Sequence, residues 1–112
     1  MKKIILALTF GILFQLHGIS QNNHEQIAEN LTNKFIEQVE STITLEPKEK
    51  KVLNELKMEH MRDLIKVNTA HKNDPDVQEQ RVAVTKTFVI QLREKIGVEK
   101  AQAILMAGKP KN

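Results

Sequence analysis

The positions of proline and glycine constrain this chain most, because they divide it into stretches whose apolar residues recur at helical spacing. Pro47, Pro75, Gly97 and Gly108 each lie at an end of such a stretch. Proline favours the first turn of a helix, and glycine favours the position just after one. We therefore expect an all-α fold, a small antiparallel helical hairpin or bundle of about four helices, over residues 24–41, 47–70, 75–96 and 98–107.

Each predicted helix has an apolar stripe, with residues that recur every three or four positions and would face a shared core. The stripe of the first helix consists of Ile27, Leu31, Phe35, Ile36 and Val39. The second has Val52, Leu53, Leu56, Met61, Leu64 and Ile65, the third Val77, Val84, Phe88, Leu92 and Ile96, and the last Ala101, Ile104 and Leu105.

Residues 81–90 also permit a different interpretation, because they are rich in β-branched residues. Val82, Val84, Phe88 and Ile90 all lie on even positions, as in a strand with one buried face. The helical stripe continues beyond both ends of this segment, however, and no partner strand is predicted. Since an isolated strand leaves its backbone groups unpaired, we expect a helix here.

Residues of the types that cap helices stand at the predicted helix starts. Pro47 takes the first helical position of the second helix, and Glu49 can reach back toward the cap, as in a capping box. Asp74 is a favourable N-cap for a third helix that begins with Pro75. The predicted capping residues are Glu46, Pro47, Glu49, Asp74, Pro75 and Gly97.

The start of the chain has the layout of a secretory signal peptide. Lys2 and Lys3 precede an almost entirely apolar run over residues 4–16, and two small residues stand before a plausible cleavage site at Gln21. The run is shorter than the roughly 20 residues that a membrane span needs. The mature protein is therefore expected to be periplasmic or secreted, without an integral membrane segment.

Cleavage leaves a single small domain. The predicted organisation is a signal peptide over residues 1–20, a helical domain over 21–108 and a disordered tail over 109–112. With no cysteine, the domain cannot form the disulfides that often stabilise small exported proteins. Its stability must come from helix packing or self-association.

Charge and aromatic content argue against a nucleic-acid partner. The 17 basic residues include Lys2 and Lys3, so 15 remain in the mature chain against 14 acidic residues. This balance produces no strongly positive field. Phe35 and Phe88 are the only aromatic residues after position 20, and there is no Trp or Tyr for base stacking.

Catalytic and metal-binding motifs are not found in the sequence. It has no glycine-rich phosphate loop, no nucleophile elbow and no HExxH motif. His60 and His71 would lie about 16 Å apart along one helix, too far to share an ion. Met58, His60 and Met61 fan around that helix and do not converge. We expect neither an enzyme nor a cofactor; a metal site that uses His24, His60 or His71 across a subunit interface is a remaining alternative.

A surface for loose binding of other proteins is the most concrete functional prediction. Charged residues crowd the second helix, and methionine-rich apolar surfaces adapt to varied partners. The candidate client-binding residues are Met58, Met61, Leu64, Ile65 and Phe88. Core packing is the competing interpretation for each of them.

Two helix starts share a layout, Leu45-Glu46-Pro47-Lys48-Glu49 and Ile96-Gly97-Val98-Glu99-Lys100. This repeat resembles the LTxxQ motifs of the Spy/CpxP family of small periplasmic proteins, although both copies lack the threonine and the glutamine. The resemblance implies a helical-hairpin protomer, often dimerised into a curved layer. It also implies an ATP-independent chaperone or envelope-stress component that binds unfolded or partner proteins.

A second hypothesis comes from a different class of function. The same apolar stripes would all be covered if the chain were a structural or interaction module that forms a homodimer or larger homo-oligomer. Measurements of client binding and of oligomeric mass separate the two hypotheses.

Overall fold

Residues 23–109, the part of the chain that the computed structural model describes, form four helices and no strand. An N-terminal helix covers residues 23–40 and is followed by α2 (Pro47–Ala70), α3 (Val77–Ile96) and α4 (Val98–Ala107). The predicted all-α bundle is confirmed, and residues 81–90 are helical. The predicted signal peptide and residues 110–112 of the predicted tail lie outside the described residues.

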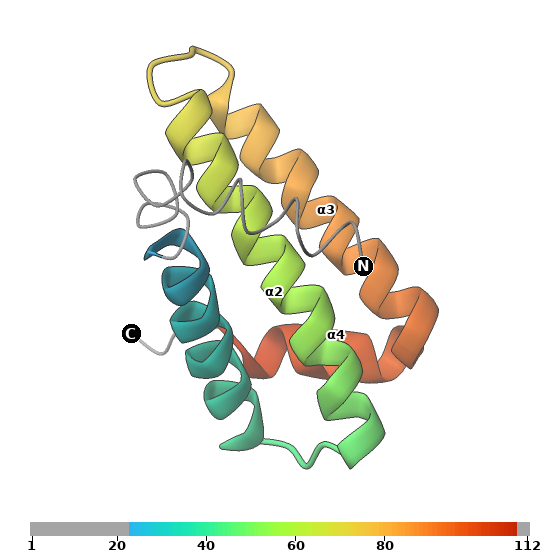
Figure 1. The fold of residues 1–112 in the computed structure, drawn as a ribbon. Coiled ribbons are helices and arrows are strands. Elements are labelled where there is room, and N and C mark those ends of the chain that lie inside the picture. The colour runs from blue at the N-terminus through green and yellow to red at the C-terminus, as the bar shows by residue number, and fades with distance from the viewer. Residues whose placement is uncertain (1–22, 110–112) are drawn as a thin grey trace, which may run out of the picture.

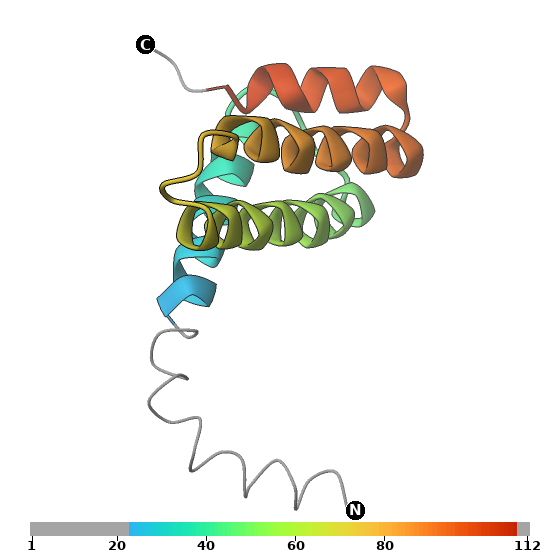
Figure 2. The same cartoon turned by 90° about the horizontal axis from the view of Figure 1, so that it is seen from above.

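The helices pack in chain order. The chain reverses between the N-terminal helix and α2 and again between α2 and α3, so that neighbours lie side by side in opposite directions (Figure 1). The short helix α4 crosses behind the lower part of this arrangement. Figure 2 shows α2, α3 and α4 stacked in that order when the molecule is seen from above.

The core lies where all four helices meet. Leu53 of α2, Leu92 of α3, Ile104 of α4 and Val39 of the N-terminal helix are fully buried there. Because each helix contributes one apolar stripe, this end of the molecule surrounds its core on all sides. We call this part of the molecule, residues 23–61 and 88–109, the base.

The N-terminal helix buries Ile36 and Val39 as predicted, but its first half buries a different face from the predicted one. Ala28 and Thr32 are fully buried, whereas Ile27 and Leu31 are 45% and 42% exposed. Both sets recur every four residues, so the periodicity alone fits either orientation. Small side chains at the interface let two helices approach closely, since interaxial distance depends on the side chains between them. This explains why Ala28 and Thr32 face inward.

The start of α2 has the predicted chemistry. Pro47 takes the first helical position, and Glu49 Oε1 accepts a hydrogen bond of 2.9 Å from the Glu46 backbone N–H. Lys100 of α4 also reaches this point, with its Nζ 3.4 Å from Glu49 Oε1 and 3.0 Å from the Thr44 carbonyl oxygen. The base is therefore tied together across the segment that joins the first two helices.

The predicted start of α3 is wrong by two residues. The helix begins at Val77 with Asp76 as its N-cap, and Asp74 and Pro75 lie in the preceding turn. The Val77 N–H approaches the Asp74 carbonyl oxygen at 3.3 Å, and His71 Nδ1 lies 2.6 Å from Asp74 Oδ2. Proline suits the second position of such a turn as well as a helix start. The Asp74 carboxylate pairs with His71 and does not cap the helix.

Gly97 joins α3 to α4 with a φ of +102°, a backbone conformation that L side chains rarely adopt. It ends α3, with its N–H donating to the Arg93 carbonyl oxygen at 3.0 Å. Its own carbonyl oxygen accepts from the Ala101 N–H at 2.9 Å, as the first bond of α4. One glycine thus allows the sharp change of direction that places α4 across the base.

Candidate binding groove

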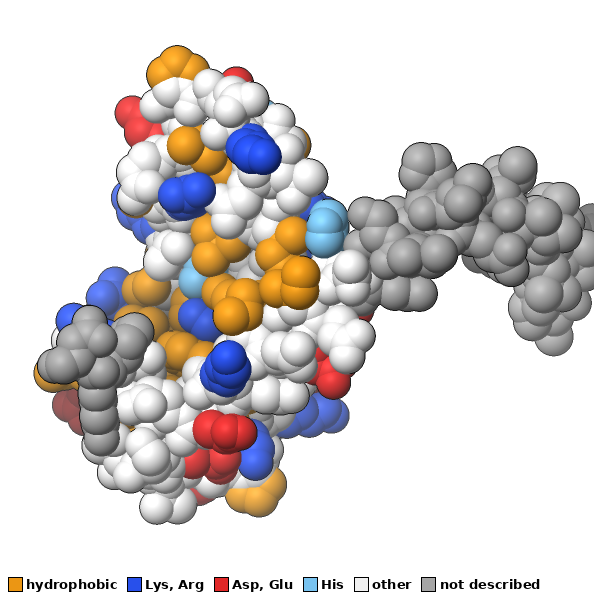
Figure 3. All heavy atoms as spheres, turned by 90° about the vertical axis from the view of Figure 1, so that its left-hand side faces the viewer, with side chains coloured by type: hydrophobic (Ala, Val, Ile, Leu, Met, Phe, Trp, Pro, Cys, Tyr) orange, Lys and Arg blue, Asp and Glu red, His pale blue; other side chains and the backbone are white. Residues whose placement is uncertain are grey.

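An open groove of about 540 Å³ lies in the base between the N-terminal helix, α2 and the C-terminal end of α4. Its apolar lining comes from three elements and consists of Leu31, Phe35, Met61 and Leu105. The other lining residues are Lys34, Gln38, Lys57, Gly108 and Lys109. Figure 3 shows hydrophobic side chains gathered around a hollow on this side of the molecule, with basic and histidine side chains among them.

Phe35 forms one wall of the groove and packs against Gly108, the residue that follows α4. The Gly108 backbone lies so close to the Phe35 ring that there is no room for a Cβ at this position. The Phe35 ring also meets Phe88 of α3 edge to face, with centroids 6.3 Å apart. Packing on both sides fixes the ring, so the wall that it forms is rigid.

Lys57 lies at the floor of the groove and is only 9% exposed. Its Nζ is 4.0 Å from the centroid of Phe35 and 4.8 Å from that of Phe88. Aromatic faces carry partial negative charge and attract an ammonium group at these distances. The two rings thus supply part of the stabilisation that burial removes from the charged side chain.

His60 lies one turn further along α2 and contacts the ammonium group directly. Its Nδ1 is 3.2 Å from Lys57 Nζ, and its Nε2 is 3.0 Å from Thr85 Oγ1 of α3. The imidazole stacks on the Phe88 ring at a centroid distance of 4.7 Å. Since the ammonium can only donate, Nδ1 accepts from Lys57, and the Nε2–H of the neutral ring donates to Thr85.

Burial changes the ionisation of both groups. Desolvation lowers the pKa of Lys57 from 10.5 to about 8. Desolvation, followed by the nearby Lys57 charge, lowers the pKa of His60 from 6.5 to about 4. At neutral pH Lys57 is therefore mainly charged and His60 is neutral, which matches the direction of the hydrogen bond between them.

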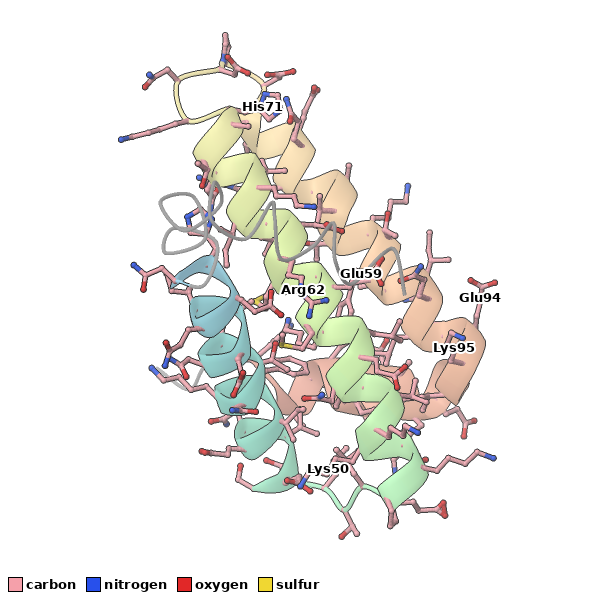
Figure 4. The ribbon with its side chains drawn as sticks, in the orientation of Figure 1. Lys50, Glu59, Arg62, His71, Glu94 and Lys95 are labelled. Atoms are coloured by element: carbon pink, nitrogen blue, oxygen red, sulfur yellow. The ribbon has the colours of Figure 1, made fainter. Side chains whose placement is uncertain are left out.

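The lining of the groove carries positive charge only. Three lysines line it, Lys34, Lys57 and Lys109, and no aspartate or glutamate is among its lining residues. Elsewhere on the described surface some opposite charges are paired, such as Lys50 with Glu40 at 3.2 Å and Arg62 with Glu25 at 2.6 Å. Figure 4 shows Lys50 and Arg62 where α2 lies beside the N-terminal helix.

The predicted client-binding residues are dispersed in the structure. Met61 lines the groove but is largely buried, and Phe88 lies beneath the groove in the core. Met58 and Ile65 line two other surface depressions, and Leu64 is half-buried on the upper part of α2. Phe88 is therefore a core residue, and Met61 is the only one of the five candidate residues that lines the groove.

The histidines considered as metal ligands do not come together. His60 is occupied by Lys57 and Thr85, and His71 pairs with Asp74 in the turn at the far end of α2. His24 lies near Glu25 and Ile65. Among residues 23–109, no three histidine, cysteine or acidic side chains are grouped in a way that could hold a metal ion.

The sequence analysis placed Leu31, Phe35 and Leu105 in apolar stripes that face a core, and it did not single out Lys57. A signal for Lys57 was nevertheless present. It stands four residues after Leu53 and four before Met61, in the middle of the apolar stripe of α2. A lysine at such a position must be buried with that stripe or interrupt it.

No protein family model, curated protein or solved structure matches this chain. Within residues 23–109, no helix has the length and apolar content needed to cross a membrane. The account of function therefore depends on the geometry and charge of the groove.

Proposed function

We propose that this chain is an exported, non-enzymatic binding protein that holds apolar segments of other polypeptides in the groove of the base. Its most concrete form is an ATP-independent periplasmic chaperone or an envelope-stress adaptor of the Spy/CpxP type. The observation that carries the proposal is the open groove itself, which has apolar walls from three helices and a basic floor.

The exposure of Leu31 supports a binding role for the groove. A leucine that remains 42% exposed beside a half-buried phenylalanine keeps apolar surface in contact with water. Covering such surface with an apolar side chain of a guest contributes roughly 25 cal/mol per Å². Because the groove is open and not a closed cavity, it accommodates guests of varied shape with modest affinity.

The residues at the floor of the groove also fit a binding function better than a catalytic one. Both ring nitrogens of His60 already have partners, and burial lowers its pKa to about 4, which makes it a weak base at neutral pH. Lys57 has its ammonium held between two aromatic rings. This arrangement holds the Lys57 ammonium group in a fixed position.

An aggregation assay with a chemically unfolded client protein tests the proposal. We expect the mature chain to suppress client aggregation and the Leu31→Glu variant to lose most of this effect, because a carboxylate would replace the apolar wall. Ile90→Glu is the matched control, since Ile90 is a similarly exposed residue of α3 that does not line the groove. Equal activity of the two variants would reject the groove as the binding site.

A homo-oligomeric interaction module is the second candidate, and one observation favours it. Ile27 and Leu31 lie four residues apart on the N-terminal helix and are both more than 40% exposed. A second copy of the chain would cover this pair. Sedimentation equilibrium tests the alternative: a stable dimer that Leu31→Glu dissociates, together with no effect on client aggregation, would favour the module over the binding protein.

A further inference from the structure

The Lys57 ammonium is buried without a counter-ion among the described residues. It is more than nine-tenths buried, and its only hydrogen bond within residues 23–109 is to the neutral His60 ring. No ion pair is formed between Lys57 and any carboxylate of that part of the chain. An ammonium has three donors, so two of them have no hydrogen-bond partner among the described residues.

Buried charges are usually paired, because removing an unpaired charge from water is costly. Here the Phe35 and Phe88 rings offset only part of that cost. An isostere of similar length without the charge, such as methionine, would fill the same space against the rings. The protein therefore keeps an unneutralised positive charge at the floor of an apolar groove, where a ligand carboxylate would neutralise it.

We propose that the groove selects polypeptide segments in which a carboxylate side chain lies beside apolar side chains, with the carboxylate accepting hydrogen bonds from Lys57. Lys34 and Lys109, which also line the groove, orient the same group from its rim. The complementary partner is thus an acidic-apolar segment, and a basic-apolar segment is rejected by like charge. This inference rests on the proposed function and specifies the ligand of the same site.

A polypeptide fits the shape of the groove better than a free small acid. The apolar wall residues come from two elements besides the helix that carries Lys57, with Leu31 and Phe35 on the N-terminal helix and Leu105 on α4. A peptide segment with apolar side chains before and after its acidic residue places one of these apolar side chains against each wall. A long-chain carboxylate has its charge at one end and covers one wall only.

Fluorescence anisotropy with three labelled ten-residue peptides tests the proposal. The peptides share four apolar residues, two on each side of a central position that is Glu, Gln or Lys. At pH 7 we expect the Glu peptide to bind about tenfold more tightly than the Gln peptide, since hydrogen bonds between charged groups are roughly twice as strong as neutral ones. The Lys peptide is expected to bind most weakly.

Two variants test whether Lys57 is the side chain that distinguishes the Glu peptide from the Gln peptide. Lys57→Met keeps the apolar stem and removes the charge, so it should lose most of the difference between the Glu and Gln peptides and keep only the small part that Lys34 and Lys109 contribute. Lys51→Met, which changes an exposed lysine of the same helix outside the groove, should keep the full tenfold difference. Circular dichroism establishes that both variants are folded before binding is compared.

The outcomes separate this inference from the proposed function. Equal binding of the Glu and Gln peptides, abolished by Leu31→Glu, would overturn the inference and leave the binding groove intact. Binding of no peptide would reject both proposals. Tight binding of dodecanoate by a chain that binds none of the peptides would assign the groove to long-chain carboxylates and would also overturn the inference.

Discussion

The base and the tip of this molecule differ in how they are held together. In the base all four helices meet, and Leu53, Leu92 and Ile104 are fully buried. In the tip, residues 62–87, the end of α2 and the start of α3 lie side by side, and no side chain is buried. The N-terminal helix reaches only the lower edge of this region, where Glu25 pairs with Arg62. Amphipathic helices of the same kind therefore enclose a core in the base, whereas in the tip each helix is covered by a neighbouring helix on one side only.

The comparison shows why the groove lies in the base. Two helices alone cannot surround an apolar side chain, so the tip depends on polar contacts such as Arg81 Nε to Asn68 Oδ1 at 2.6 Å. Three or four helices form walls that stay in place when a concave surface is left open between them. A rigid groove with a buried charge at its floor requires the packing that only the base provides.

Truncation of one leucine in each region should produce the largest difference. Leu92→Ala in the base is expected to lower the free energy of unfolding by about 3 kcal/mol, because it leaves a cavity in a fully enclosed core. Leu64→Ala in the tip should cost about 1 kcal/mol or less, since Leu64 is only half-buried. Urea unfolding monitored by circular dichroism measures both values. Equal costs would show that the tip has a core of its own.

Lys57 makes the stability of the base depend on pH. Its pKa is about 8 when folded and 10.5 when unfolded, so the unfolded chain binds more protons between these values. The free energy of unfolding should therefore rise with pH across this window, by about 3 kcal/mol. The lowered pKa of His60 has an effect in the same direction: the free energy of unfolding should also rise with pH between about pH 4 and 6.5.

Lys57→Met isolates the lysine contribution. This variant should be more stable than the parent chain at pH 7 and should lose the rise above pH 8, while it keeps the rise below pH 6.5 that His60 contributes. Urea unfolding at a series of pH values gives both curves. Parallel curves for the two proteins above pH 8 would mean that the Lys57 ammonium is not desolvated in the base.

The smallest expected effect concerns the N-terminal helix, the outermost wall of the base. Thr32 is fully buried, and its hydroxyl has no hydrogen-bond partner within the described residues. Thr32→Val keeps the shape and removes the unsatisfied group, so it should raise the free energy of unfolding by about 1 kcal/mol. Thermal unfolding measures the change, with Thr87→Val as a control on the exposed surface of α3. A loss of stability would indicate that Thr32 has a partner.

Much of the fold follows from the sequence because local chemistry determines where these helices begin and end. Pro47 and Gly97 mark boundaries that the structure reproduces at the expected residues. Asp74 and Pro75 do not, since an Asp-Pro pair is equally suited to a turn, and the pairing of Asp74 with His71 depends on the tertiary arrangement. Residues 81–90 are helical because the packing of α3 against α2 outweighs their β-branched composition.

The site was less predictable from sequence. The rotation of the N-terminal helix could not be derived, because Ile27 with Leu31 and Ala28 with Thr32 have the same spacing. The choice between them depends on how closely the helix approaches α2. The role of Lys57 depends on two phenylalanine rings that come from different helices, 22 residues before it and 31 after it in the chain. Such a convergence of distant residues is visible only in three dimensions.

Amide hydrogen exchange, with and without the Glu-containing peptide, tests the central claim most directly. The account predicts new protection at the base, in the segments around Leu31, Lys57 and Leu105, with exchange in residues 62–87 unchanged. Protection confined to the tip, or spread evenly over the chain, would contradict the assignment of binding to the groove.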